Sequence, residues 1–87
     1  MNLDGKKILI TGGTGSFGRK ITETITKRHK PDRLVIFSRD ELKQYEMAQV
    51  FPRSRHPYIR YFIGDVRDRE RLKRALAGIE MVIHAAA

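Results

Sequence analysis

With 87 residues, 40% of them hydrophobic, the chain can form one small domain, and the absence of cysteine excludes disulfides and thiolate metal sites. Eighteen Lys and Arg against ten Asp and Glu give a formal net charge of +8, which favours anionic partners such as nucleotides, nucleic acid or acidic membranes. No apolar run approaches the roughly 20 residues that span a bilayer, and residues 1–7 lack the apolar core of a signal peptide, so we expect a soluble cytoplasmic chain with no membrane partner.

Residues 6–11 are almost uninterruptedly apolar, which is typical of a strand buried on both faces of a parallel sheet. A glycine-rich segment follows with two overlapping spacings, Gly13-x-Gly15-x-x-Gly18 and Gly12-x-x-Gly15-x-x-Gly18. Glycines there permit a tight turn and let the backbone approach a pyrophosphate, which the first amides of the next helix would face. We therefore predict a dinucleotide pyrophosphate cradle, the alternative being a strand-to-helix turn that binds nothing.

The first helix is predicted over residues 16–29. Phe17, Ile21 and Ile25 recur every fourth residue and form one apolar stripe along it. Pro31 cannot continue a helix and so ends the segment.

Residues 34–37 are a second apolar run of strand length. Ser38 and Glu41 follow it with the spacing of a capping box, which predicts the start of a second helix over residues 40–50. The side of this helix that we expect to be buried carries Leu42, Tyr45, Gln49 and Val50.

Residues 51–57 contain two prolines and no periodicity, so we predict a surface loop that leads into a third strand over residues 58–63. A third helix, capped by Asp68, is predicted to end just before Gly78, which stands where a C-terminal cap is expected. A fourth strand follows at residues 81–84.

Strict alternation of strands and helices predicts an α/β fold, namely the N-terminal half of a Rossmann-type doubly wound parallel sheet with four strands in the order 3-2-1-4. Because such folds carry about six strands in two halves, we expect residues 1–87 to be one incomplete dinucleotide-binding domain. The fourth strand would then be an apolar edge without its neighbour, which favours a homo-oligomer.

The segment after the second strand predicts which cofactor is bound. Proteins that bind NAD usually place an acid here for the ribose 2′-hydroxyl, but this chain has Ser38 and Arg39. A hydroxyl and a guanidinium suit the 2′-phosphate of NADP, and Lys43 adds charge one helical turn later. In the structural alternative, Ser38 caps the helix while both cations are solvated.

Two further segments lie at the predicted carboxyl edge of the sheet. Asp65 can accept a hydrogen bond from an adenine amino group while Val66 packs on the ring, although a turn aspartate beside Gly64 is the equal alternative. The small residues Ala85, Ala86 and Ala87 leave room for the cofactor, or else begin a helix.

No catalytic residue and no metal site is predicted. His84 ends an apolar strand without a partner at recognisable spacing, so we expect a structural histidine. No cluster of His and acids has metal-ligand spacing, and none of the three tyrosines is followed by a lysine four residues later.

Four segments, residues 11–18, 38–44, 62–68 and 84–87, together resemble the inverting UDP-N-acetylglucosamine 4,6-dehydratases. These lyases form a polysaccharide-biosynthesis branch of the extended short-chain dehydrogenase/reductase family. The resemblance implies a tightly held NADP that takes a hydride from C4 of a UDP-sugar, permits loss of water across C5 and C6, and returns the hydride to C6.

The resemblance also implies roles for individual residues. The pyrophosphate group is Gly12, Thr14, Gly15, Ser16, Phe17 and Gly18; the 2′-phosphate group is Ser38, Arg39, Asp40 and Lys43; the adenine group is Asp65 and Val66; the inner cofactor group is Ala85, Ala86 and Ala87. The catalytic tyrosine and lysine of the family, and its sugar-binding domain, would lie beyond residue 87, so we expect this chain alone to be inactive.

Two other functions remain as alternatives. A related nucleotide-sugar epimerase or reductase shares the glycine motif. A small basic nucleic-acid-binding module would explain the charge, but the basic residues are interleaved with acids and the aromatic residues form no stacking motif, so we expect no nucleic-acid partner.

Overall fold

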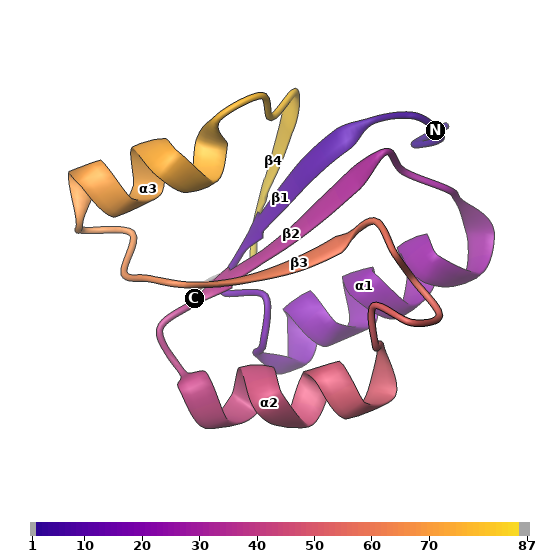
Figure 1. The fold of residues 1–87 in the computed structure, drawn as a ribbon, viewed down its shortest axis with the longest axis horizontal. Helices are drawn as coiled ribbons and strands as arrows, with labels where there is room; N and C mark the ends of the chain where they lie inside the picture. Colours follow the sequence, from indigo (N-terminus) through magenta and orange to yellow (C-terminus); the bar gives the residue numbers. More distant parts are fainter. Residues whose placement is uncertain (1, 86–87) are drawn as a thin grey trace.

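The computed structural model describes residues 2–85, which alternate between strands and helices (Figure 1). Each predicted element is present and no boundary differs by more than one residue. The elements are β1 (Lys7–Thr11), α1 (Ser16–Arg28), β2 (Arg33–Ser38), α2 (Glu41–Val50), β3 (Ile59–Ile63), α3 (Arg69–Leu76) and β4 (Met81–His84). Among these described residues, no helix is both long and apolar enough to cross a membrane.

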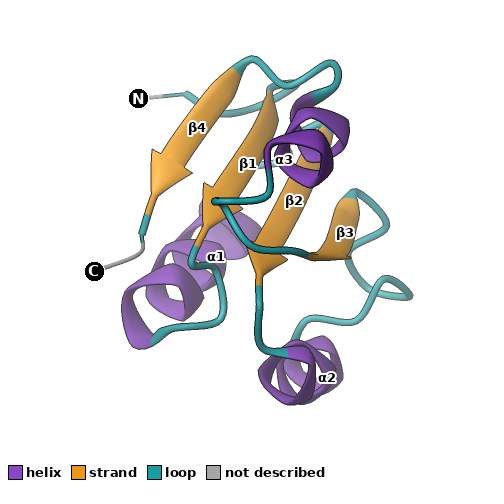
Figure 2. Cartoon of the chain, turned by 90° about the vertical axis from the view of Figure 1, so that its left-hand side faces the viewer, coloured by secondary structure: helices purple, strands orange, loops and turns teal. Residues whose placement is uncertain are grey.

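The strands form one parallel sheet in the order β3-β2-β1-β4, which confirms the predicted fold class. The register pairs Ile8 of β1 with Leu34 of β2 and with Met81 of β4. Helices α1 and α2 cover one face of the sheet and α3 covers the other (Figures 1 and 2). Because the strands are parallel, all four end at the same edge of the sheet, where the connections to the helices also begin.

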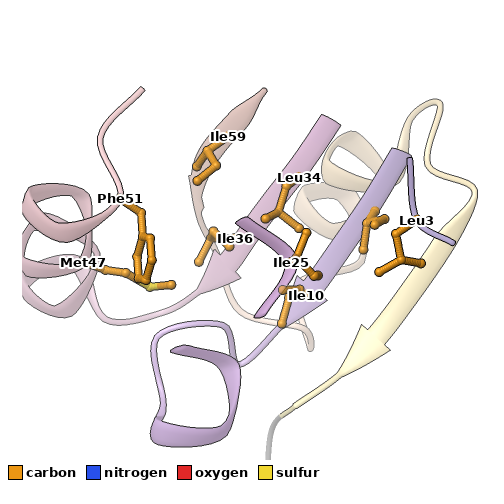
Figure 3. Packing of buried hydrophobic residues seen from close by; sticks show 9 residues of the cluster. Leu3, Ile10, Ile25, Leu34, Ile36, Met47, Phe51 and Ile59 are labelled. Atoms are coloured by element: carbon orange, nitrogen blue, oxygen red, sulfur yellow. The ribbon is translucent and has the colours of Figure 1, made fainter. Parts of the chain in front are cut away.

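Strand β1 is buried on both faces, as its apolar run predicts. Because side chains alternate along a strand, Ile8 and Ile10 pack beneath α1 and α2 while Leu9 packs beneath α3, and all three are fully buried. The larger core lies on the α1 and α2 side (Figure 3), where Ile25 and Met47 are its helix residues.

The predicted buried face of α2 is wrong. Leu42 and Tyr45 are 67% and 66% exposed, whereas Gln44 and Met47 are buried. The predicted cap is also wrong, because Ser38 is the last residue of β2 and the side chain of Asp40 accepts from Lys43 N at 2.9 Å. This cap starts the helix so that Gln44, Met47 and then Phe51, spaced i, i+3 and i+7, face the sheet.

The apolar stripe predicted for α1 is only partly correct. Ile25 is buried and Ile21 packs against the core, but Phe17 is 59% exposed at the edge of the sheet. Gly18 and Thr22 are buried instead, and Gly18 lies so close to Gly13 of the preceding turn that no larger side chain fits there.

Candidate functional site

A cavity of about 700 Å³ opens at the carboxyl edge of the sheet, where ligands bind in open α/β folds. Four connections contribute to it: the β1–α1 turn, the β2–α2 and β3–α3 segments, and the residue after β4. The cavity is lined by Gly12, Thr14, Gly15, Ser16, Phe17, Phe37, Ser38, Arg39, Asp40, Lys43, Gly64, Asp65, Val66, Arg67 and Ala85.

The β1–α1 turn is held against the sheet by glycines. Gly12 has a φ of +64°, which side chains rarely adopt. A Cβ on Gly13 would lie 2.7 Å from Ile36 Cγ2, and one on Gly18 would lie 2.5 Å from Gly13 O. Gly15 differs, because its nearest neighbour would be Gly12 O at 3.5 Å. Gly15 is therefore a place where the backbone is open to the cavity rather than packed.

The first turn of α1 borders this space, because Ser16 and Phe17 line the cavity. Arg19 N makes the first bond of the helix, donating to Gly15 O at 2.9 Å, so the amides of residues 16–18 precede the intrahelical ladder. The N-cap Gly15 has no side chain to satisfy them, and no acidic residue stands in the first turn. These amides and the positive end of the helix dipole form a place for an anion.

The β2–α2 segment supplies a hydroxyl and two cations. Ser38 is buried at the end of β2, whereas Arg39 and Lys43 are exposed and line the same end of the cavity. Asp40 also lines it, but its carboxylate caps α2 by accepting from Lys43 N. Asp40 therefore places Lys43 and the start of the helix.

A residue that the sequence motifs missed, Gln44, lies directly behind Ser38. Its Nε2 donates to Ser38 Oγ and to Phe62 O, each at 3.0 Å, with longer contacts of 3.4 Å to Ile36 O and Ser38 O. The spacing of Gln44, Met47 and Phe51 is the signal that could have placed it on the buried face of α2.

Asp65 is held by two arginines. Arg67 Nη2 lies 2.7 Å from Asp65 Oδ2 and Arg67 N donates to Oδ1 at 2.9 Å, while Arg39 Nη1 lies 3.6 Å from Oδ2. The hydrogen bond from the Arg67 side chain, followed by that from its backbone, holds the pKa of Asp65 well below its usual value, and Asp65 in turn raises the pKa of Arg67. Arg67 was also missed, because nothing in its spacing marks it as a partner of Asp65.

Phe37, which lines the cavity, is packed between its neighbours. Phe37 is fully buried and stacks on Phe62 with ring centroids 5.8 Å apart, and Arg71 lies 4.3 Å above the Phe62 ring. A Cβ on Gly64 would lie 2.8 Å from the Phe37 ring, so glycine is needed where β3 ends.

The remaining predicted residues lie in different places. Val66 is 41% exposed on the cavity, and Ala85, whose N donates to Thr11 O at 2.9 Å, lines it from the β4 side. Gly18 packs against Gly13 and does not line the cavity. Ala86 and Ala87 lie outside the described residues. Apart from Gly18, every described residue that we predicted for the site lines the cavity.

His84, expected to be structural, pairs its Nδ1 with the Thr11 hydroxyl of the adjacent strand. It is exposed on the edge strand β4 and is not among the residues that line the cavity. The hydrogen-bond partner of His84 is therefore Thr11 of β1, a residue of the sheet.

The strand order and the position of the cavity define the chain as the first half of a Rossmann-type fold. A short chain dehydrogenase/reductase family structure superposes with a TM-score of 0.75 at 21% identity, covering 100% of this chain and 36% of that one, and so shows the fold. Residues 8–87 match the family described as Polysaccharide biosynthesis protein, and the chain belongs to that family.

Individual relatives agree with this assignment. The chain is 58% identical over 82 residues to the UDP-N-acetylglucosamine 4,6-dehydratase (inverting) of Campylobacter jejuni subsp. jejuni serotype O:2, covering 94% of this chain and 24% of the relative. It is 40% identical over 85 residues to the UDP-glucose 4-epimerase of Rickettsia massiliae, with the same shares of 94% and 24%. The X-ray structure of Pen from Bacillus thuringiensis superposes with a TM-score of 0.90 at 37% identity, covering 100% of this chain and 27% of that one. The chain thus spans about a quarter of the length of the relatives it matches, and the predicted resemblance is confirmed.

Proposed function

We propose that residues 1–87 bind NADP as the cofactor-binding part of an inverting UDP-N-acetylglucosamine 4,6-dehydratase. One observation carries the proposal: an anion-binding turn and a group of a hydroxyl and two cations open onto the same cavity. NADP differs from simpler phosphate ligands because it carries both a pyrophosphate and a separate 2′-phosphate.

The geometry supports a division of the cavity into subsites. The open backbone at Gly15 and the amides at the start of α1 suit the pyrophosphate, and Gly12, Thr14, Ser16 and Phe17 line the same region. Gly18 serves this subsite indirectly, because its close contact with Gly13 brings the helix to the turn.

The other end of the cavity suits the adenosine. Ser38, Arg39 and Lys43 would hold the 2′-phosphate while Val66 packs on the adenine, and Arg39 would exchange its 3.6 Å ion pair with Asp65 for the phosphate. The inner cofactor would lie against Ala85, and we assign Ala86 and Ala87 to the same subsite although they lie outside the described residues.

The role of Asp65 is more restricted than its position alone suggests. Both of its oxygens already accept bonds from Arg67, so an adenine amino group would share the carboxylate with that arginine. A carboxylate has about four lone-pair sites, and three N–H groups of Arg67 (N, Nε and Nη2) bond to it, with Nε shared between both oxygens, which leaves room for about one further donor.

The reaction of the whole protein follows from its relatives rather than from residues 1–87. Bound NADP supplies the hydride chemistry, with UDP-N-acetylglucosamine as the substrate. The residues of this chain bind and orient the cofactor, and we place the catalytic tyrosine and lysine and the sugar-binding domain outside residues 1–87. On this proposal, the isolated chain binds nucleotide but does not turn over substrate.

A nucleotide-sugar epimerase is the second candidate, since a Rickettsia epimerase is 40% identical over 85 residues. The higher identity of 58% to the dehydratase favours the first proposal. Incubating a longer protein that carries this segment with UDP-N-acetylglucosamine discriminates between them, because a 4-keto-6-deoxy product indicates dehydration and an inverted C4 hydroxyl indicates epimerisation.

Cofactor binding is tested by titrating the chain with NADP, NAD and a DNA duplex. We expect NADP to bind more tightly than NAD. DNA binding with a steep salt dependence and no affinity for NADP would overturn the proposal in favour of a nucleic-acid-binding module.

A further inference from the structure

The side-chain amide of Gln44 is buried and hydrogen-bonded. It is only 5% exposed, on the face of α2 that packs against the ends of β2 and β3. Three of its four contacts are backbone carbonyls, those of Ile36, Ser38 and Phe62. Carbonyl oxygens only accept hydrogen bonds, so the amide nitrogen of Gln44, and not its oxygen, must face them.

Because the amide nitrogen of Gln44 faces these carbonyls, it is also the donor in the fourth contact, with Ser38 Oγ. An amide nitrogen donates and does not accept, so in the 3.0 Å contact with Ser38 the serine Oγ is the acceptor. The hydroxyl hydrogen of Ser38 must then point elsewhere. Ser38 lines the cavity beside Arg39 and Lys43, and within residues 2–85 the structure shows no hydrogen bond that the Ser38 hydroxyl donates.

We propose that Gln44 is a positioning residue that makes the cavity select a phosphate monoester on the adenosine ribose. By donating to Ser38 Oγ, Gln44 reserves the hydroxyl hydrogen of Ser38 for an oxygen of that phosphate. This inference rests on the proposed function, because it concerns the 2′-phosphate subsite of the same cavity.

The chemistry of the ligand explains why this arrangement discriminates. A phosphate monoester near neutral pH carries two negative charges or nearly so, and its oxygens are strong acceptors. A ribose hydroxyl can donate as well as accept and gains much less from a fixed donor. Holding Ser38 as a donor therefore favours a ligand with a 2′-phosphate over the same ligand without it.

A purely structural role for Gln44 predicts something different. The bonds to the three carbonyls tie α2 to β2 and β3, and losing them would weaken the fold and every ligand equally. Met47 and Phe51 also hold α2 in the core, and Asp40 caps it, so the helix keeps other attachments when the Gln44 amide is replaced. Weakened packing could also displace Lys43, which lies on the same helix, so the positioning role is distinguished by a loss that is confined to ligands with a 2′-phosphate and that depends on the Ser38 hydroxyl.

The test uses adenosine 2′,5′-bisphosphate and 5′-AMP, which differ only in the 2′-phosphate, with NADP and NAD as a second pair. Calorimetric Kd values are measured for the chain and for Gln44→Met, which keeps the length of the side chain but removes the donor. Gln49→Met is the matched control, because Gln49 lies exposed on the same helix and, among the described residues, its side chain donates only to Tyr45 O of its own helix. Thermal melting checks that each variant is folded.

We expect Gln44→Met to lower the preference for the 2′-phosphate about tenfold, with little change for 5′-AMP and none for Gln49→Met. In a Ser38→Ala background, Gln44→Met should change the preference no further, because it acts through that hydroxyl. Equal losses for both ligands, or an undiminished effect without Ser38, would overturn the inference.

Two further results separate this inference from the proposed function. If the unaltered chain and Arg39→Ala both show no preference for the 2′-phosphate, the proposed function fails and the inference fails with it. If Arg39→Ala loses the preference but Gln44→Met keeps it, only the inference fails.

A measurement on the unaltered chain covers the case in which Gln44→Met does not fold. The side-chain amide signals of Gln44 in ¹⁵N-labelled protein should shift with adenosine 2′,5′-bisphosphate and stay in place with 5′-AMP. Identical shifts with both ligands would contradict the inference.

Discussion

Arg39→Ala tests the assignment of the cofactor most directly. Arg39 lines the cavity with a side chain that is 71% exposed, and within residues 2–85 its ion pair is the 3.6 Å contact with Asp65. Removing it leaves Asp65 paired, because Arg67 lies closer, at 2.7 Å. The substitution therefore takes one cation from the proposed phosphate subsite without freeing a carboxylate.

The expected effect follows from the exposure of this side chain. A hydrogen bond to a charged group contributes roughly 1.5–3 kcal/mol. Solvent and salt screen an exposed guanidinium, so we take the lower bound of about 1.5 kcal/mol, which corresponds to roughly a tenfold rise in Kd for NADP. NAD has no 2′-phosphate, and its Kd should change less than about twofold.

Calorimetric titration of both nucleotides at one fixed salt concentration measures this difference. Arg53→Ala is the control, because Arg53 is exposed in the segment between α2 and β3, does not line the cavity, and carries the same charge. Equal losses for NADP and NAD in Arg39→Ala would refute the assignment. A matching loss of NADP affinity in Arg53→Ala would show that net charge, rather than the subsite, controls binding.

Three other expectations concern stability, pH and assembly. Gly18→Ala should lower the melting temperature because its Cβ would meet Gly13 O at 2.5 Å, and normal melting of this variant would contradict the close approach. Gly15→Ala should melt normally but lose nucleotide affinity, since its Cβ would make only an ordinary contact with Gly12 O at 3.5 Å and Gly15 lines the cavity. Because the pKa of Asp65 is depressed in the folded protein, its ionised carboxylate stabilises the fold at pH values above 3.8, the usual pKa, and this contribution is lost as the pH falls below 3.8. Asp65→Asn should therefore flatten the pH dependence of the melting temperature below about pH 5. A pH profile parallel to that of the unaltered chain would count against the ion pairs. Val82→Lys should reduce self-association, measured by sedimentation velocity, because Val82 is 51% exposed on the edge strand β4. Val50→Lys is the control, since Val50 is 50% exposed on α2. If the unaltered chain is a monomer at all concentrations, association through this edge is excluded.

Local patterns were sufficient for the elements themselves. Asp68 caps α3 and Gly78 follows it with a φ of +77°, both as expected, because caps depend on residues only a few positions apart. The alternation of these elements was then enough for the parallel sheet and its order, since right-handed crossovers leave few arrangements open.

The orientation of α2 could not be predicted in the same way. Its apolar residues are distributed around the helix, so periodicity alone did not identify the buried face. Beside Met47, the buried face carries a polar residue, Gln44, whose acceptors lie on β2 and β3 and are brought together only once the sheet has formed. A burial rule based on hydrophobicity therefore placed Leu42 and Tyr45 inside, where the structure leaves them exposed.

The sequence by itself determined the order of strands and helices, the glycine turn and the position of Ser38 and Arg39 directly after the second strand, because each depends on neighbours along the chain. The tertiary structure alone decided that Arg67 and Arg39 share Asp65 and that Gln44 Nε2 donates to Ser38 Oγ. The physical reason is that hydrogen bonds and ion pairs depend on distance and direction in space. Neither is defined until parallel strands bring the ends of separate segments to one edge of the sheet.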